Sequence, residues 1–163
     1  WLGNAACALS YEGLAWITGA AVMVGGMMPA SSIVVLALLY SLGAHGIMTL
    51  NDFKAVQGDL QMGVRSLPVQ LGVVGAAKAA CLVMLVPQVW VSLLLLHWGA
   101  HLHALAVLLL MLAQLPLMLR FIQSPVEKAL SVSAFGVPLF VAGMMVSAWA
   151  LRLGYGMPQG LAA

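Results

Sequence analysis

The sequence predicts an all-α integral membrane protein, and its composition and length lead to that fold class. Of its 163 residues, 64% are hydrophobic and 6% are charged, a composition typical of chains that lie in a bilayer. A spanning helix needs about 20 mostly apolar residues, so the chain has room for about five spans. We therefore expect one transmembrane helical domain over residues 1–163. Membrane lipid is an expected partner and nucleic acid is not, because six basic residues are too few for a nucleic-acid surface.

The first two apolar segments are separated by a short turn without charged residues. Glycines 25 and 26 and Pro29 end the first segment, because glycine and proline interrupt helices. The second segment follows at once and continues to the polar Asn51. These limits place the two segments at residues 13–28 and 31–50.

Three more apolar segments follow a stretch that is richer in charge. Trp90, Trp98 and Trp149 lie toward segment ends, as aromatic side chains do at a membrane–water interface. We place these segments at residues 75–97, 103–121 and 129–151.

The charges between the segments predict an orientation. Five of the six basic residues lie in or beside the connections between the second and third segments and between the fourth and fifth, with Lys78 and Arg120 just inside the adjoining segments. Arg152 alone falls on the other side. With five spans, both of these connections lie on the same side of the membrane. Basic loops face the cytoplasm, so we expect residues 51–72 to form a cytoplasmic loop of a protein integral to an inner membrane.

That loop also holds the residues most suited to chemistry. Asp52, Lys54, Asp59 and Arg65 lie within it, in a chain that is otherwise almost free of charge. On a helix, the spacing of seven positions between the two acids would return both carboxylates to one face about 10 Å apart. This spacing suits a diphosphate bridged by Mg²⁺, since Mg²⁺ takes few protein carboxylates and completes its octahedron with water and phosphate oxygens. The alternative is a solvated interfacial loop whose acids pair with its bases.

The same stretch resembles a known family. Residues 51–59, NDFKAVQGD, and 63–72, GVRSLPVQLG, are similar to the second acidic motif of the chlorophyll and bacteriochlorophyll synthases, which are intramembrane prenyltransferases. Residues 11–14, YEGL, and 38–41, LLYS, also resemble that family. The resemblance implies the C-terminal half of a bundle of about nine helices in a photosynthetic membrane.

The resemblance also implies an activity and roles for the motif residues. Members of the family join a geranylgeranyl or phytyl diphosphate to the propionate of a chlorophyllide or bacteriochlorophyllide, with Mg²⁺ as cofactor. By this likeness Asp52 and Asp59 bind Mg²⁺ and, with Lys54, form the catalytic group. Asn51, Lys54 and Arg65 match the positions that bind the diphosphate.

Three departures from the family pattern leave the enzymatic assignment open. Gln57 stands where the family has Glu, and Leu60 stands where it has Arg. The family's first acidic motif is absent from these residues. The alternative function is a truncated, non-catalytic relative that serves as a pigment-binding or structural subunit of a photosynthetic membrane complex.

His45, which shortly precedes the motif, has two open interpretations. It is positioned to contact the pigment headgroup or to bind the pigment's central Mg²⁺, and the alternative is a histidine packed and satisfied inside the bundle.

Overall fold

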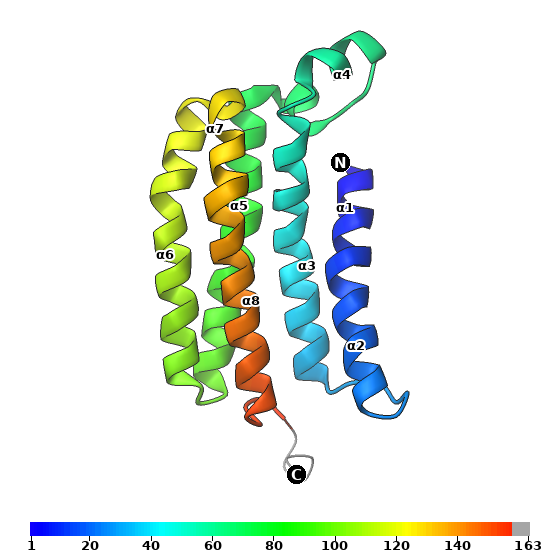
Figure 1. Ribbon diagram of the computed structural model, residues 1–163, viewed down its shortest axis with the longest axis vertical. Coiled ribbons are helices and arrows are strands. Elements are labelled where there is room, and N and C mark those ends of the chain that lie inside the picture. The colour runs from blue at the N-terminus through cyan, green and yellow to red at the C-terminus, as the bar shows by residue number, and fades with distance from the viewer. Residues whose placement is uncertain (158–163) are drawn as a thin grey trace.

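The computed structural model describes residues 1–157 and contains five helical rods long and apolar enough to cross a membrane (Figure 1). The predicted all-α membrane fold is confirmed. The first rod joins α1 (Leu2–Ala8), the π-helical turn η1 (Leu9–Leu14) and α2 (Ala15–Met23). The second, third and fourth are α3 (Ser31–Asp52), α5 (Leu67–His97) and α6 (His101–Gln123). The fifth joins α7 (Pro125–Ser131), η2 (Val132–Gly136) and α8 (Val137–Arg152).

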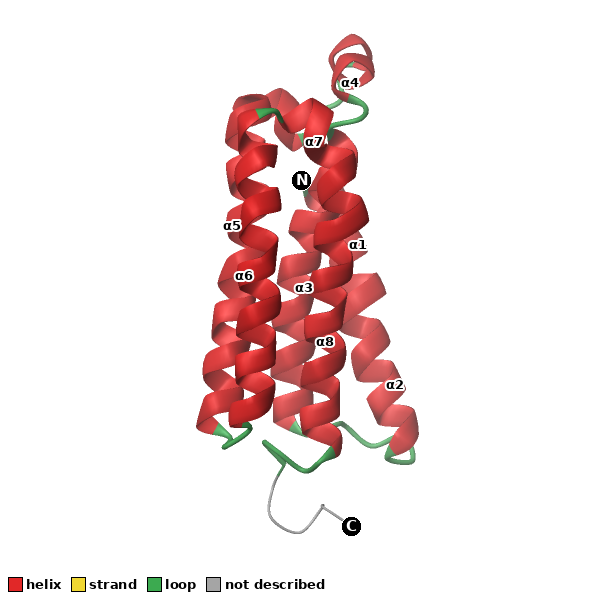
Figure 2. Ribbon diagram, turned by 60° about the vertical axis from the view of Figure 1, so that its left-hand side comes forward, coloured by secondary structure: helices red, strands yellow, loops and turns green. Residues whose placement is uncertain are grey.

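Helices α3, α5, α6 and α8 form a four-helix bundle around one core, and the first rod packs chiefly on α3 (Figures 1 and 2). Large apolar side chains cover much of the outer surface of all five rods, as lipid-facing surfaces require. Within the bundle, the side-chain amides of Gln88 on α5 and Gln114 on α6 bond each other at 2.8 and 3.3 Å. Both side chains are fully buried, so each satisfies a polar group that the bilayer would otherwise leave unpaired.

Two glycines bring α3 close to its neighbours. A Cβ on Gly46 would lie 2.6 Å from the backbone oxygen of Ala80 and 2.6 Å from the side chain of Met84, both on α5. A Cβ on Gly43 would lie 2.5 Å from the ring of Phe140 on α8. The absence of side chains at these positions therefore allows the close approach of α3 to α5 and α8.

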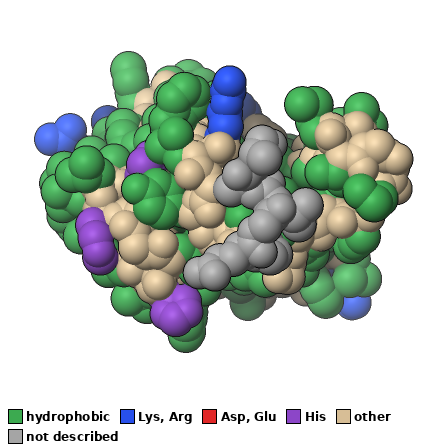
Figure 3. Space-filling model, turned by 90° about the horizontal axis from the view of Figure 1, so that it is seen from below, with side chains coloured by type: hydrophobic (Ala, Val, Ile, Leu, Met, Phe, Trp, Pro, Cys, Tyr) green, Lys and Arg blue, Asp and Glu red, His purple; other side chains and the backbone are tan. Residues whose placement is uncertain are grey.

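A separate short helix, α4 (Val56–Met62), projects beyond the end of α3, at the same end of the bundle as α7. We call this end, formed by residues 51–66 and 120–128, the motif end. The N-terminal residue lies toward it, as Figure 1 shows. In Figure 3, which views the opposite end, histidine side chains are visible and no acidic side chain of the described residues is seen.

The largest errors in the predicted limits are at the starts of the first and third spans. The first span begins at Leu2 and not at residue 13, because Asn4, Ser10 and Glu12 lower the local hydropathy of a segment that is nonetheless helical. The third begins at Leu67 and not at residue 75. Within this helix, Gly72 has a φ of +72° and kinks the backbone. The kink lies close to residue 75, where the sequence predicted that the segment begins. Residues 51–72 are thus mostly helical.

Candidate functional site

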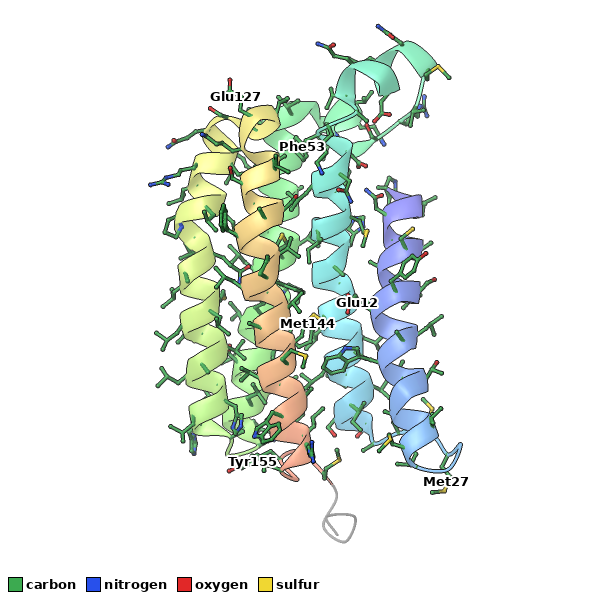
Figure 4. All side chains as sticks on the ribbon, viewed as in Figure 1. Glu12, Met27, Phe53, Glu127, Met144 and Tyr155 are labelled. Atoms are coloured by element: carbon green, nitrogen blue, oxygen red, sulfur yellow. The ribbon has the colours of Figure 1, made fainter. Side chains whose placement is uncertain are left out.

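Asp52 is the last residue of α3 and lies half-buried at the motif end. The helix ends there in a tight turn, in which the amides of Lys54 and Ala55 bond the carbonyls of Asn51 and Asp52 at 3.2 and 3.1 Å. Phe53 is buried beneath this turn, at the junction of α3 and α4 labelled in Figure 4. Tertiary packing thus fixes the point where the chain leaves α3.

The residue that holds the turn is Phe53. Its ring packs edge-on against the ring of Phe121 on α6, with centroids 5.0 Å apart and planes at 72°. This geometry is favourable for aromatic pairs. It ties the end of α3 to the fourth span, so the backbone at Asp52 is supported from below by the bundle core.

Asp59 lies on α4 and not on a continuation of α3, so the expectation of one helix bearing both acids is wrong. The break at residues 53–55 separates them. The Asp59 amide bonds the carbonyl of Ala55 at 2.8 Å, and its carbonyl accepts the amide of Val64 at 2.8 Å. Gly63, with a φ of +69°, ends α4 in the left-handed conformation that glycine favours.

The two carboxylates nonetheless share one region. The charge of Asp59 acts on the Asp52 carboxylate, and both side chains are half-buried. No group of three or more His, Cys, Asp or Glu side chains able to hold a metal ion occurs within residues 1–157. The site thus offers two carboxylates to any ligand, not a complete protein cage for a metal ion.

One residue at this site was not predicted from the sequence. The side-chain amide of Asn4, on α1, donates a hydrogen bond of 2.9 Å to Oδ2 of Asp52. A polar residue in an otherwise apolar, Ala-rich segment was the available signal. Because the apolar pattern predicts a first helix that begins at residue 13, it does not place the side chain of Asn4 beside Asp52.

The predicted basic and polar partners lie at the surface of the motif end. Asn51, Lys54 and Arg65 are exposed. Among the described residues, Asn4 is the one whose side chain hydrogen-bonds the Asp52 carboxylate, and neither Lys54 nor Arg65 does so. For Asp52 this counts against the alternative in which the acids of the loop pair with its bases.

The two departures from the family pattern also lie on α4. Gln57 and Leu60 are both exposed, Leu60 by 61% of its surface. Neither side chain is buried in the described part of the structure. Their placement leaves the packing of Asp59 intact.

His45 lines a pocket of about 220 Å³ between α3, α5 and the N-terminal residue. The pocket is lined mostly by apolar groups, among them Trp1, Leu67 and Ala80. Nδ1 of His45 is buried and has no hydrogen-bond partner within residues 1–157. The interpretation of His45 as a packed histidine with satisfied nitrogens is therefore not supported at this nitrogen.

Comparison with known proteins adds named relatives. The chain is 53% identical to the bacteriochlorophyll synthase 33 kDa chain of Cereibacter sphaeroides over 152 residues, which cover 93% of this chain and 50% of that protein. It is 47% identical to the bacteriochlorophyll synthase 34 kDa chain of Chloroflexus aurantiacus, over 91% of this chain and 47% of that protein. It is 40% identical to the chloroplastic chlorophyll synthase of Avena sativa, over 92% and 39% respectively.

The matches all cover more than nine-tenths of this chain but only a part of each relative. The chain spans about half the length of the bacterial relatives it matches and less of the plant relative. No family model matches the chain. No solved structure matches it.

Proposed function

On the premise that this chain is a homologue of the bacteriochlorophyll and chlorophyll synthases, we propose that it forms part of a membrane prenyltransferase. In this proposal the complete enzyme esterifies the propionate of a chlorophyllide or bacteriochlorophyllide with a geranylgeranyl or phytyl group. The donor is the corresponding prenyl diphosphate. The identities of 40–53% over more than nine-tenths of the chain support the assignment.

The observation that carries the proposal is that Asp52 and Asp59 both lie half-buried at the motif end. The carboxylates come from two different helices, and the charge of one acts on the other. Placing like charges together costs free energy in the absence of a cation. A cationic ligand that bridges them would relieve that cost.

The donor atoms suit Mg²⁺ that is shared with a diphosphate. Mg²⁺ is held in such sites by one or two carboxylates together with substrate phosphates and water, and two carboxylates are what this region provides. When bound, Mg²⁺ would neutralise charge on the diphosphate and so make it a better leaving group. Asp52 and Asp59 would hold it.

The remaining polar residues have roles that follow from charge. Lys54 and Arg65 are exposed at the same end of the bundle, and we assign them to the phosphate oxygens, for which arginine provides a bidentate fork. Asn51 would donate a further hydrogen bond.

In the reaction the bond between C1 of the prenyl group and the diphosphate oxygen breaks, and the electron pair leaves with the diphosphate. An oxygen of the acceptor carboxylate forms the new bond to C1, and no proton is released because that carboxylate is already ionised.

The proposal includes an orientation in the inner, photosynthetic membrane. Four of the six basic residues, Lys54, Arg65, Arg120 and Lys128, lie at the motif end, whereas Arg152 lies at the other. The positive-inside rule then supports a cytoplasmic motif end. A water-soluble diphosphate group would be bound at that surface while the prenyl chain lies in the apolar part of the bundle.

Substitution of Asp59 tests the function. In protein purified from the cells that make it, so that any further segment is present, Asp59→Asn should lower Mg²⁺-dependent ester formation by about 100-fold or more. Glu127→Gln is the matched control, because Glu127 is an exposed acid of α7 at the same end. It should leave the rate unchanged.

The same assay distinguishes a prenyltransferase from the alternative, non-catalytic function. A non-catalytic pigment-binding or structural subunit would form no ester in the unsubstituted protein, yet would still retain pigment through purification. Ester formation that is equal in the Asp59→Asn variant and the parent would instead remove Asp59 from the site.

A further inference from the structure

We propose that His45 is a positioning residue for the acceptor: its imidazole N–H donates a hydrogen bond to the acceptor carboxylate and directs it toward C1 of the donor. This inference rests on the proposed prenyltransferase function. It concerns the second substrate, for which the motif residues provide no binding group.

The location of His45 relative to Asp52 is the first support. The two residues lie seven positions apart on α3, which is an unbroken helix from Ser31 to Asp52. Seven residues make about two turns, so both lie on nearly the same face about 10 Å apart along the axis. His45 is therefore on the membrane side of the site, where the reacting end of a donor held at Asp52 would lie.

The pocket itself is the second support. Its walls come from Trp1, α3 and α5, and the closely packed Gly46 and Ala80 are both lining residues. The hydroxyl of Thr49, another lining residue, already donates a hydrogen bond of 2.9 Å to the carbonyl of His45. The imidazole is thus the polar lining group that remains available on α3, and its buried Nδ1 has no partner among the described residues.

The size of the pocket decides between a carboxylate arm and a whole pigment ring. At about 220 Å³ it is smaller than the roughly 300–1,000 Å³ of pockets that enclose a drug-sized ligand. It suits the propionate arm of a tetrapyrrole and not the macrocycle. A carboxylate that leaves water for an apolar pocket requires a hydrogen-bond donor, and a neutral imidazole carries one N–H.

Binding of three pigments to the purified protein tests the assignment. The pigments are a bacteriochlorophyllide, its metal-free form and its propionate methyl ester, each titrated by pigment fluorescence. His45→Leu should weaken binding of both free acids by about 10- to 100-fold, the usual effect of losing a hydrogen bond to a charged group. Binding of the methyl ester, whose carbonyl accepts only a weaker, uncharged hydrogen bond, should fall by no more than a few-fold, and this retained binding also shows that the variant is folded.

Two further variants complete the test. His45→Gln keeps an N–H donor and should restore most of the affinity for the free acids. His97→Leu, which replaces an exposed histidine at the opposite end of the bundle, should have no effect. In ester formation, His45→Leu should raise the KM for the acceptor and leave the KM for the donor unchanged.

The contrary results are distinct. Loss of affinity for the Mg²⁺-containing pigment alone would show that His45 binds the central metal, and equal loss for the methyl ester would show a purely steric role. Either result overturns the assignment, as does unchanged binding of the acids. Failure of the unsubstituted protein to form ester, measured in the same preparations, would contradict the proposed function itself.

Discussion

The side-chain amide of Asn4 donates a 2.9 Å hydrogen bond to Oδ2 of Asp52, across 48 residues of sequence. This bond joins the first membrane span to the end of the second. It occupies one carboxylate oxygen and leaves Oδ1 for a ligand. Asn4 is therefore placed to orient Asp52 without contacting the donor itself.

Asn4→Leu removes this bond and should weaken binding of a prenyl diphosphate in the presence of Mg²⁺ by about 10-fold, since a hydrogen bond to a charged group contributes about 1.5–3 kcal/mol. Affinity measured by calorimetry checks the prediction. Ser10→Ala, at an exposed position on the same span, is the control. Equal affinity in the Asn4 variant and the control would show that the bond does not orient Asp52.

Gly46→Ala should destabilise the bundle. The added Cβ would lie 2.6 Å from a backbone oxygen of α5, so α3 and α5 must separate, at a cost of about 1–3 kcal/mol. Thermal unfolding in detergent measures this loss. Gly19→Ala is the matched control, because a Cβ at this helical glycine meets nothing within 4 Å. A melting temperature as high as that of the control would contradict the close packing.

Gln88 and Gln114 should show non-additive effects on stability. Replacing one with Leu leaves the side-chain oxygen of the other without its hydrogen-bond donor, while its Nε2 keeps a bond to a backbone carbonyl. This loss should cost about 1–3 kcal/mol, whereas replacing both removes the polar groups together. The double variant should thus be more stable than the two single losses predict, by about 1 kcal/mol. Strictly additive losses in a double-mutant cycle would argue against the reciprocal bonds.

Cysteine labelling tests the orientation. In a background with Cys7→Ser and Cys81→Ala, Gln61→Cys should react with an impermeant reagent from the cytoplasmic side. His101→Cys, in the turn region at the other end, should react from the opposite side. The reverse pattern would place the motif end on the non-cytoplasmic side of the membrane. The site would then face away from a cytoplasmic supply of prenyl diphosphate.

The five spans could be predicted from sequence because bilayer thickness alone sets the length of an apolar helix. The break between Asp52 and Asp59 could not. Residues 53–56 include no proline or glycine, and the chain turns there because Phe53 packs on Phe121, a contact with a helix far away in sequence. The helix propensities of residues 53–56 give no information about a contact with so distant a helix.

The acids of the site were predictable and their surroundings were not. Asp52 and Asp59 stand out because charge is rare in this chain. Asn4 belongs to the site only because the first span packs on α3. The pocket beside His45 likewise depends on the approach of α5 at Gly46, which a linear pattern does not contain.

Calorimetry with geranylgeranyl diphosphate, with and without Mg²⁺, tests the central claim most directly. The protein purified from the cells that make it should bind the diphosphate tightly only when Mg²⁺ is present. That dependence should disappear in Asp52→Asn and Asp59→Asn and persist in Glu127→Gln. Binding that is unaffected by Mg²⁺ or by the two aspartate substitutions would contradict the claim that these carboxylates hold a metal-bridged diphosphate.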